Sequence, residues 1–277
     1  MARARRHRSS RRRSSRNGGS SILLYILGAL VAVGLLGAAV FYRNQTEQEM
    51  AVNPDTLCPL ATGPVAMTAI LFDLTDPLTQ AQSKQLLQLI EKEIADAPIG
   101  TQFTMGVVSE QPEAWGATAP LCKPHSGSDV STLTQNVKLV EERYEQQFLG
   151  PLHENIQSMI SANGANHSPI MEAMQTLIAD TSGYLTFAGP RKVIIISDLL
   201  QHSDAMSFYR GDDWQSFSES AEFRRLNRTL GGVDVVIFEV PRNVSKIKDP
   251  RVIEDFWVHY FDIQGTHLPT FKTIGDL

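Results

Sequence analysis

Four residues in three separate segments of this chain carry hydroxyl or carboxylate side chains at positions that a parallel sheet would bring together. Asp73 and Thr75 follow one apolar run, Ser168 opens a helical pattern, and Asp198 follows a second apolar run. Carboxylate and hydroxyl oxygens are hard ligands of the kind that Mg²⁺ or Mn²⁺ prefers. These four residues, with Asp76 as a further candidate ligand, predict a metal-dependent recognition site.

Each of these residues also has a purely structural interpretation. Asp73 would cap a helix that starts at Pro77. Ser168 would cap a helix that starts at Pro169, and Asp198 would simply end a strand. The two interpretations of Ser168 are compatible, because a hydroxyl that faces the start of a helix can also face an ion.

The pattern along the chain predicts the elements that must position these side chains. From residue 65 onward strand-like and helix-like patterns alternate, which is typical of an α/β domain with a largely parallel, doubly wound sheet. The strand-like runs are 67–74, 102–108, 193–197 and 233–240. The helical patterns are 77–95, 131–161 with a break near residues 150–151, 169–179, 218–230 and 249–260. The stretch 109–128 is rich in Pro and Gly and is expected to be irregular.

The N-terminal part of the chain has a different character. Eight arginines and no acidic residue lie between residues 3 and 16, which predicts a disordered basic tail. The next 21 residues, 22–42, carry no charge, and as a helix they would span about 31 Å, enough for one membrane crossing. A cleaved signal peptide is the alternative. We favour a retained anchor, because the apolar run is long and no convincing cleavage site precedes residues 43–45.

The distribution of charge predicts the orientation of this anchor. Eight arginines precede the span and only Arg43 closely follows it, so the N-terminus is expected in the cytoplasm of a bacterial cell, with one crossing of the inner (cell) membrane. The domains expected are a cytoplasmic tail, 1–21, a transmembrane helix, 22–42, a polar linker, 43–64, and a periplasmic or extracellular domain, 65–277. The net charge of −5 becomes −13 without the eight arginines, since 17 basic then oppose 30 acidic residues, so nucleic acid is not an expected partner.

The two cysteines, Cys58 and Cys122, both fall on the side of the membrane predicted to be oxidising. A disulfide between them is therefore expected. It would fasten the irregular stretch 109–128 to the segment that precedes the domain. Two unpaired thiols would be expected only if the orientation were the reverse.

The order of these motifs resembles that of a von Willebrand factor A domain. The features that carry the resemblance, which covers roughly residues 65–262, are a strand followed by Asp-x-Thr, the helix opening Ser-Pro-Ile-x-Glu-Ala-Met, and a strand ending in Ser-Asp. Members of that family build a metal-ion-dependent adhesion site from a D-x-S-x-S motif, a Thr before a central helix, and a later Asp. The resemblance implies the following ligands for Mg²⁺ or Mn²⁺ here: Asp73, Thr75, Ser168 in place of the threonine, and Asp198.

This chain departs from the family pattern at one position. The fifth residue of the first motif is Pro77, which has no side-chain oxygen. Asp76 is the candidate substitute, either directly or through a water, since Mg²⁺ keeps several waters in its coordination shell.

A different resemblance gives an enzymatic alternative. The sequence around Asp73 is similar to the nucleophile loop of haloacid-dehalogenase-like phosphatases, in which an Asp after the first strand attacks phosphate beside Mg²⁺. Those enzymes also need a lysine and an acidic pair after a later strand. Here the acidic pair Asp212-Asp213 falls in a polar loop, so we do not expect an enzyme.

The segment 201–218 follows the candidate site directly and contains Tyr209, Arg210 and Trp214. Aromatic residues and arginine dominate binding energy at interfaces, so these three are the predicted partner contacts. Packing of the aromatic rings against the domain is the alternative. The sequence thus predicts a membrane-anchored module that binds another protein, for instance through an acidic side chain of the partner. A metal-independent structural component of a membrane assembly is the alternative function.

Overall fold

The computed structural model describes residues 19–73, 75, 77–132, 135–160, 166–242, 247, 249 and 251–275. The chain divides into two units, Met1–Glu49 and Met50–Leu277, which we describe separately. Residues 1–18, which make up most of the predicted basic tail, lie outside the described residues, and so does Asp76.

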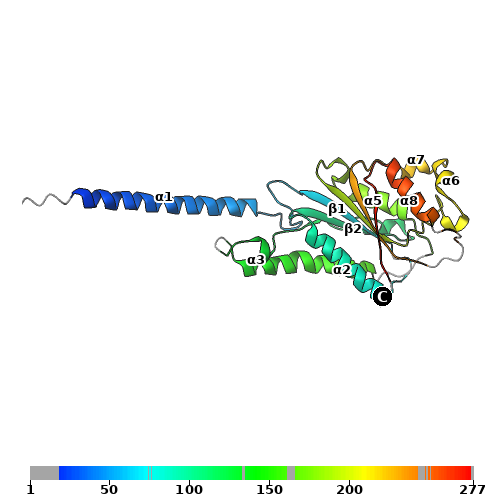
Figure 1. The fold of residues 1–277 in the computed structure, drawn as a ribbon, viewed down its shortest axis with the longest axis horizontal. Helices are drawn as coiled ribbons and strands as arrows, with labels where there is room; N and C mark the ends of the chain where they lie inside the picture. Colours follow the sequence, from blue (N-terminus) through cyan, green and yellow to red (C-terminus); the bar gives the residue numbers. More distant parts are fainter. Residues whose placement is uncertain are drawn as a thin grey trace, which may run out of the picture. The chain divides into compact units, whose positions relative to one another are not determined.

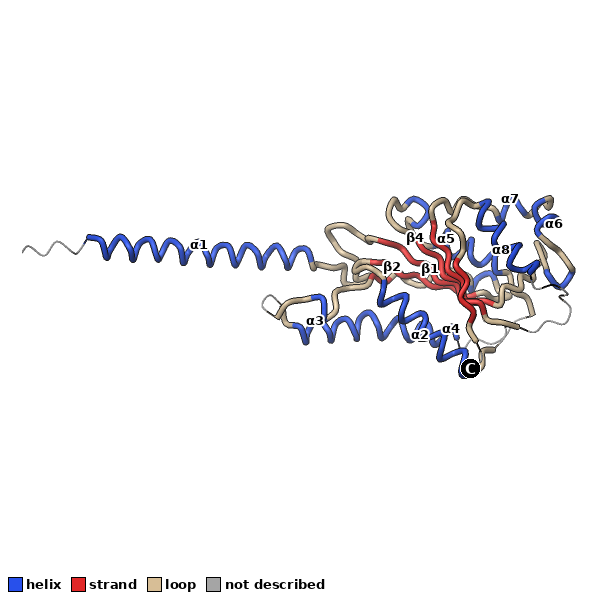
Figure 2. The backbone as a smooth tube through the Cα atoms, in the orientation of Figure 1, coloured by secondary structure: helices blue, strands red, loops and turns tan. Residues whose placement is uncertain are grey.

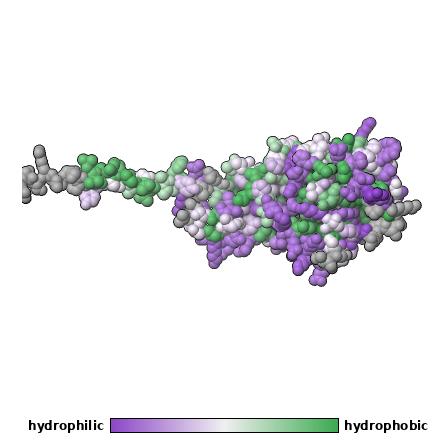
Figure 3. All heavy atoms as spheres, viewed as in Figure 1, coloured by the Kyte–Doolittle hydropathy of each residue, from purple (hydrophilic) through white to green (hydrophobic). Residues whose placement is uncertain are grey.

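The first unit contains one long helix, α1, Gly19–Glu49 (Figure 1). Its segment Leu23–Gln45 is long and apolar enough to cross a membrane. The described side chains of this segment are exposed, and they form the apolar surface that Figure 3 shows. The helix continues beyond the predicted end at residue 42, because residues 43–49 contain no Gly or Pro that would end it.

The second unit is built on a six-stranded sheet with the order β3-β2-β1-β4-β5-β6. Figure 2 draws its strands in red. The strands are β1 Ala66–Phe72, β2 Thr101–Val107, β3 Leu121–Cys122, β4 Arg191–Ser197, β5 Val233–Glu239 and β6 Thr270–Thr273. All neighbouring pairs are parallel except β2 with β3. The predicted doubly wound, mostly parallel α/β fold is confirmed.

Strand order determines where a site can form. The chain winds outward from β1 through β2 to β3, and then returns to the centre to place β4 on the other side of β1. The carboxyl ends of β1 and β4 therefore lie at the point where the winding reverses, which is where doubly wound sheets leave a crevice for ligands. Asp73 and Asp198 follow these two strands.

Helices cover both faces of the sheet (Figures 1 and 2). One face carries α2 Gln80–Asp96, α3 Val137–Arg143, the π-helix η3 Tyr144–Leu149 and α4 Gly150–Ile160. The other carries α5 Ile170–Asp180, α6 Trp214–Ser218, α7 Phe223–Leu226 and α8 Arg251–Ile263. Short 3₁₀ turns occupy Pro112–Ala114 (η1), Gly127–Asp129 (η2), Tyr184–Thr186 (η4) and Phe208–Arg210 (η5).

The strands alternate between two apolar cores, as the period of two requires. In β1, Ile70 and Phe72 pack with α2 and α4, whereas Ala69 and Leu71 pack with α5 and α8. All four side chains are fully buried. Burial on both faces explains why β1 and β4 are continuous apolar runs in the sequence.

Two expectations about helices were wrong. The helix expected at residues 218–230 is replaced by the short helices α6 and α7, in which Phe217, Phe223 and Leu226 pack against the core. The break expected near residues 150–151 does not occur. The π-helix η3 ends at Leu149, and Pro151 is the second residue of α4, where a proline fits the first turn and the helical path continues.

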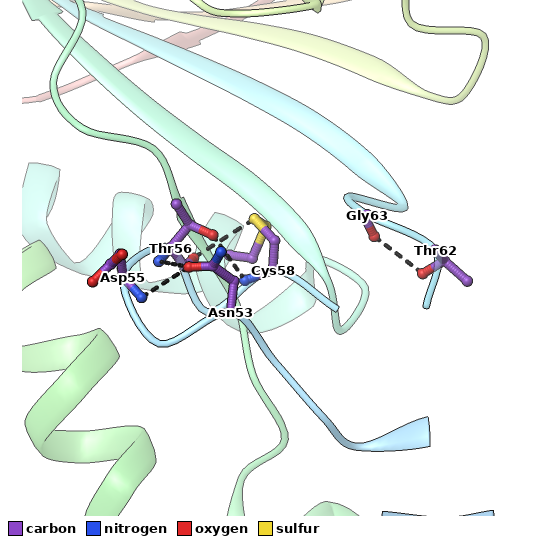
Figure 4. Close-up of a disulfide and its surroundings, with 7 residues drawn as sticks. Asn53, Asp55, Thr56, Cys58, Thr62 and Gly63 are labelled. Carbon is purple, nitrogen blue, oxygen red and sulfur yellow. Dashed lines mark hydrogen bonds between the residues drawn. A yellow bond between two sulfur atoms is a disulfide. The ribbon is translucent and has the colours of Figure 1, made fainter. Parts of the chain in front are cut away.

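Residues 50–64, the second part of the expected linker, fold onto the α/β unit. Cys58 is joined to Cys122 of β3, 64 residues away, as predicted (Figure 4). Leu57 is buried in the core of the α2 face. The side chain of Asn53 accepts hydrogen bonds from the backbone of Asp55 and Thr56 and so shapes the turn before Cys58. This segment is therefore part of the folded unit and not an extended stalk.

Candidate metal and partner-binding site

Asp73 is fixed at the carboxyl end of β1, beside β4. Its backbone N–H donates to the carbonyl of Ile196 at 2.8 Å. Its Oδ2 accepts a 2.6 Å hydrogen bond from the hydroxyl of Ser197. The side chain is only 4 % exposed. The carboxylate is thus buried and oriented at the point where the sheet winding reverses.

Two oxygens at this position have no hydrogen-bond partner within the described part of the chain, although both are buried. They are Oδ1 of Asp73 and Oγ of Ser168. Buried polar atoms are nearly always paired in folded proteins, and an unpaired one costs about 1–3 kcal/mol. Such atoms indicate a strained or functional site.

Burial raises the pKa of Asp73 above the ordinary range of an aspartate. The hydroxyls of Ser197, Ser168 and Thr75 and the backbone N–H of Thr75 act in the opposite direction, but more weakly. Ser168 is thus close enough to favour the ionised carboxylate, without giving Oδ1 a hydrogen bond of normal geometry. These surroundings therefore disfavour the ionised form of Asp73 relative to an aspartate in water.

Ser168 is held by backbone contacts and not by capping a helix. Its N–H and carbonyl pair with the carbonyl and N–H of His202, both at 2.9 Å. Helix α5 begins at Ile170, and the side chain of Gln201 accepts from the N–H of Met171 in the role of a cap. The capping interpretation of Ser168 is therefore wrong, and its hydroxyl is left for another role.

The capping interpretation of Asp73 is also wrong. Helix α2 begins at Gln80, and Thr79 caps it in a capping box with Gln82. The predicted start at Pro77 was early because Pro77 fits the first turn of a helix as well as the loop before it. Pro77 is exposed, and its carbonyl accepts a 3.0 Å hydrogen bond from Arg242.

The other predicted ligands lie in the loops beside Asp73. Thr75 is half-buried, and its hydroxyl and backbone N–H lower the pKa of the Asp73 carboxyl. Asp198 is half-buried at the end of β4, and its Oδ1 accepts a 2.9 Å bond from the N–H of Leu200. Asp198 also lines a pocket of about 480 Å³ between the ends of β4, β5 and β6. Asp76 lies outside the described residues.

Ser197 is a site residue that the ligand prediction missed. Its hydroxyl donates to Asp73 and accepts from the N–H of Leu199 at 2.7 Å. Leu199 has a φ of 63°, a conformation that a leucine rarely adopts. Ser197 could have been found, because it directly precedes Asp198 at a strand end. The strain at Leu199 leaves no signal in the sequence.

A second buried carboxylate supports the loop that follows β4. Glu172 of α5 accepts from the hydroxyl of Ser203 at 2.6 Å and from the amide of Gln201 at 2.9 Å. Because Gln201 also caps α5, the loop and the start of the helix form one hydrogen-bonded unit around Ser168. Sequence reasoning missed this network, since Glu, Gln and Ser side chains usually face solvent.

Aromatic rings form the rim of the site. His167 stacks on His202 at 4.9 Å between ring centroids, and Tyr209 contacts His202 edge-on at 5.1 Å. Tyr209 is 39 % exposed. Arg210 donates to the carbonyl of Ser203 at 2.8 Å and pairs with Asp212. Tyr209 thus presents a ring at the surface, while Arg210 also holds the loop.

Trp214, the third predicted partner contact, is half-buried in an aromatic cluster. It contacts Phe223 and Phe256 edge-on and stacks on His259 at 5.5 Å. This arrangement matches the packing role that we considered as the alternative. Its contact with a partner stays a prediction.

Among the residues that the structure describes, no group of three or more His, Cys, Asp or Glu side chains is arranged to hold a metal ion. A site at Asp73 must therefore combine carboxylates with hydroxyls. The two unpaired buried oxygens fit that requirement, because both are hard ligands.

The acidic pair considered for the phosphatase alternative has structural roles. Asp212 accepts from the N–H of Ser207 and from Arg210, and Asp213 caps α6. These contacts do not test the phosphatase alternative, which stays a hypothesis.

Comparison with known proteins leaves the function to be argued from these residues. No protein-family model and no curated protein matches the chain. Among solved structures the chain is similar to an aerotolerance-related membrane protein from Bacteroides fragilis NCTC 9343, crystallised with multiple mutations to serines. The two share 11 % sequence identity with a TM-score of 0.32, over 76 % of this chain and 92 % of the other.

Proposed function

We propose that the chain is a membrane-anchored protein-binding module that recognises its partner through a divalent cation, Mg²⁺ or Mn²⁺, at Asp73. The observation that carries the proposal is the pair of buried oxygens without partners, Oδ1 of Asp73 and Oγ of Ser168. Each costs about 1–3 kcal/mol while unpaired, and ligation of a cation would offset that cost. The resemblance to von Willebrand factor A domains supports the same assignment.

The chain holds its candidate ligands in place through neighbouring contacts. Ser197 occupies one oxygen of Asp73 and leaves the other for a ligand. The backbone of His202 fixes that of Ser168 through two hydrogen bonds. Thr75 and Asp198 complete the set of oxygen ligands. When bound, the ion would supply a coordination position for an acidic side chain of the partner, and Tyr209 and Arg210 would contact the surface around it.

The membrane part of the proposal places the α/β unit outside the cytoplasm. Residues Leu23–Gln45 would cross the inner (cell) membrane once, with the arginine-rich N-terminus inside. The disulfide Cys58–Cys122 supports this orientation, since such bonds persist in oxidising compartments.

Calorimetric titration of MgCl₂ and MnCl₂ into the full chain in detergent micelles tests the cation. We expect binding by the wild type and loss of binding in Asp73→Asn and Ser168→Ala. Ser168→Ala is the sharper variant, because it removes one hydroxyl beside the carboxylate and leaves the hydrogen bond between Asp73 and Ser197 in place. Asp96→Asn is the matched control, as Asp96 is an exposed carboxylate on α2.

Three other results would redirect the proposal. A folded wild type that binds neither ion would exclude the cation and leave a metal-independent structural component of a membrane assembly. Binding that survives both substitutions would place the ion elsewhere. Turnover of p-nitrophenyl phosphate that disappears in Asp73→Asn would instead support the phosphatase alternative.

A further inference from the structure

The α/β unit exposes its large apolar side chains unevenly. Five of the eight exposed ones among its described residues lie at a single edge of the sheet, where the parallel strands begin. The eight are Leu60, Val65, Leu139, Leu185, Tyr209, Val252, Ile263 and Leu268. The five at the edge are Leu60, Val65, Leu185, Ile263 and Leu268. We call this the amino edge; Asp73 and Ser197 lie at the opposite, carboxyl edge.

Contacts with the strand starts place three of the five residues. Val65 directly precedes β1. The carbonyl of Leu185 accepts from Arg191, the first residue of β4. Leu268 follows His267, whose N–H donates to the carbonyl of Val233 at the start of β5.

Contacts of their neighbours place the other two. Leu60 follows Pro59, and Pro59 lies against Gly100, the residue before β2. Ile263 is the last residue of α8, and the carbonyl of the next residue, Gln264, accepts from Leu230 ahead of β5. Leu268 and Leu60 are the most exposed, at 78 % and 62 %.

The amino edge is also where the chain enters the unit from α1. The candidate span ends at Gln45, and the N–H of Leu60 already donates to the carbonyl of Ala51. Only residues 46–50 lie between, which reach at most about 17 Å when fully extended. The headgroup layer is itself about 5–7 Å thick on each side of the bilayer. A linker this short limits how far Ala51 can lie from the lipid surface.

We propose that the amino edge rests on the membrane, with its five exposed apolar side chains in the lipid headgroup region. The proposal uses the membrane span of the proposed function but not its cation. Two charged side chains of this edge already have partners within the unit: Asp234 is bonded to His267, and Arg191 donates to the carbonyl of Gly231. The proposed contact is therefore apolar and does not depend on attraction to anionic lipid. With strands of seven residues, the carboxyl edge would stand about 23 Å farther out. Asp73 and Tyr209 would then face away from the membrane.

Fluorescence at single engineered cysteines tests this contact, because Cys58 and Cys122 are joined and leave no native free thiol in the described chain. Ile263→Cys and Val252→Cys lie at opposite ends of α8 and form a matched pair of exposed apolar positions. Each full-length variant, with Leu268→Cys as a third, carries an environment-sensitive dye in phosphatidylcholine vesicles. Circular dichroism checks that each variant is folded.

We expect a blue-shifted emission at positions 263 and 268, and its loss when doxyl-labelled lipid is included. The emission at position 252 should show neither the blue shift nor the quenching. Equal responses at 252 and 263 would overturn the inference, as would a blue shift that doxyl lipid does not quench, since a protein surface would then cover the edge. Chain that does not float with the vesicles would overturn the anchor and this inference together. A wild type that binds no cation, while doxyl lipid still quenches the dyes at 263 and 268, would overturn the proposed cation and leave this inference standing.

Discussion

At the scale of single residues, Asp73 is held in surroundings that oppose its charge. Burial is the largest effect and raises its pKa, and the hydroxyls of Ser197, Ser168 and Thr75 only partly counteract it. The folded chain therefore binds a proton at this carboxyl more tightly than the unfolded chain does. Its contribution to stability is greatest at low pH and falls as the pH rises from about 3.9 through the raised pKa.

Replacement of Asp73 by Asn should therefore stabilise the chain at neutral pH when divalent cations are absent. The amide oxygen can still accept from Ser197, and the amide N–H can face the unpaired oxygen of Ser168. We expect a gain of about 1–3 kcal/mol at pH 7, the typical cost of an unsatisfied buried polar group, and a smaller gain at pH 4. Urea denaturation in EDTA at a series of pH values measures both.

A less stable Asn variant at pH 7 would mean that neighbouring groups favour the ionised form, in which case the carboxylate has a structural role. Asp198→Asn offers a comparison within the same site, since Asp198 is half-buried and accepts from Leu200. Asp198→Asn should change the free energy of unfolding by less than Asp73→Asn does, whichever direction the change at Asp73 takes.

Residue types and strand ends were enough to place Asp73 and Asp198 at one edge of the sheet, because parallel strands bring their carboxyl ends together. The role of these residues, Thr75 and Ser168 as metal ligands stays a prediction. The sequence could not show which hydrogen-bond partner each side chain has. Ser168 looked like a helix cap, and only the fold shows that Gln201, 33 residues later, takes that role. Long-range contacts of this kind depend on tertiary structure, which local patterns do not encode.

At the scale of elements, Glu93 connects three parts of the fold. It lies on α2 and accepts 2.9 Å hydrogen bonds from Lys192 on β4 and from Lys272 on β6. Its side chain is only 13 % exposed. Burial opposes its ionisation, but the two lysines more than offset that effect, so the pKa of Glu93 lies below the ordinary value.

Glu93→Gln should destabilise the chain by roughly 1–2 kcal/mol at pH 7, a figure that allows for the partial exposure of both lysines. A lowered pKa contributes stability above about pH 4.3, which is lost as the pH falls through the folded value. The difference between wild type and variant should therefore shrink below pH 4. Thermal denaturation at pH 7 and pH 3.5 measures it.

Asp96→Asn is the control for Glu93, since Asp96 pairs with Lys92 on the same helix and both side chains are exposed. It should leave the melting temperature almost unchanged. An equal loss in both variants would indicate that α2 itself is weakened and that the contact with β4 and β6 is not the cause.

The central elements were predictable because they are long and buried. The strands β1, β4 and β5 contain apolar runs, β2 has apolar residues at every second position, and α2, α5 and α8 have helical periodicity. The edge strands β3 and β6 contain two and four residues, too few for any period to be visible. The helix expected at 218–230 was wrong because Phe223, Leu226 and Leu230 have the i, i+3, i+7 spacing of a helix face, although α7 ends at Leu226.

At the scale of the whole molecule, the disulfide fastens the entry segment of the chain to the edge of the sheet. Cys58 and Cys122 close a loop of 64 residues that includes β1, α2 and β2. In the chain-entropy model such a loop stabilises the fold by about 4 kcal/mol.

Replacing both cysteines by Ser should lower the free energy of unfolding by up to that amount, as measured by urea denaturation. Dithiothreitol should reproduce the loss in the wild type and have no effect on the double variant. A wild type that is equally stable with and without reductant would show that the entry segment is held by Leu57 and its neighbours alone.

The same disulfide reports on how the whole chain lies in its membrane. If the eight arginines keep the N-terminus in the cytoplasm, the α/β unit is exported and its cysteines are oxidised. Replacing all eight arginines by Gln removes the charge asymmetry, so a substantial share of the chains should insert in reverse and keep both thiols reduced. Thiol alkylation in whole cells, followed by gel electrophoresis with and without prior reduction, measures the oxidised fraction. A variant with eight lysines preserves the charge and should match the wild type, which separates topology from any specific role of arginine. Full oxidation in the Gln variant would show that α1 itself, and not the basic tail, sets the orientation of the molecule.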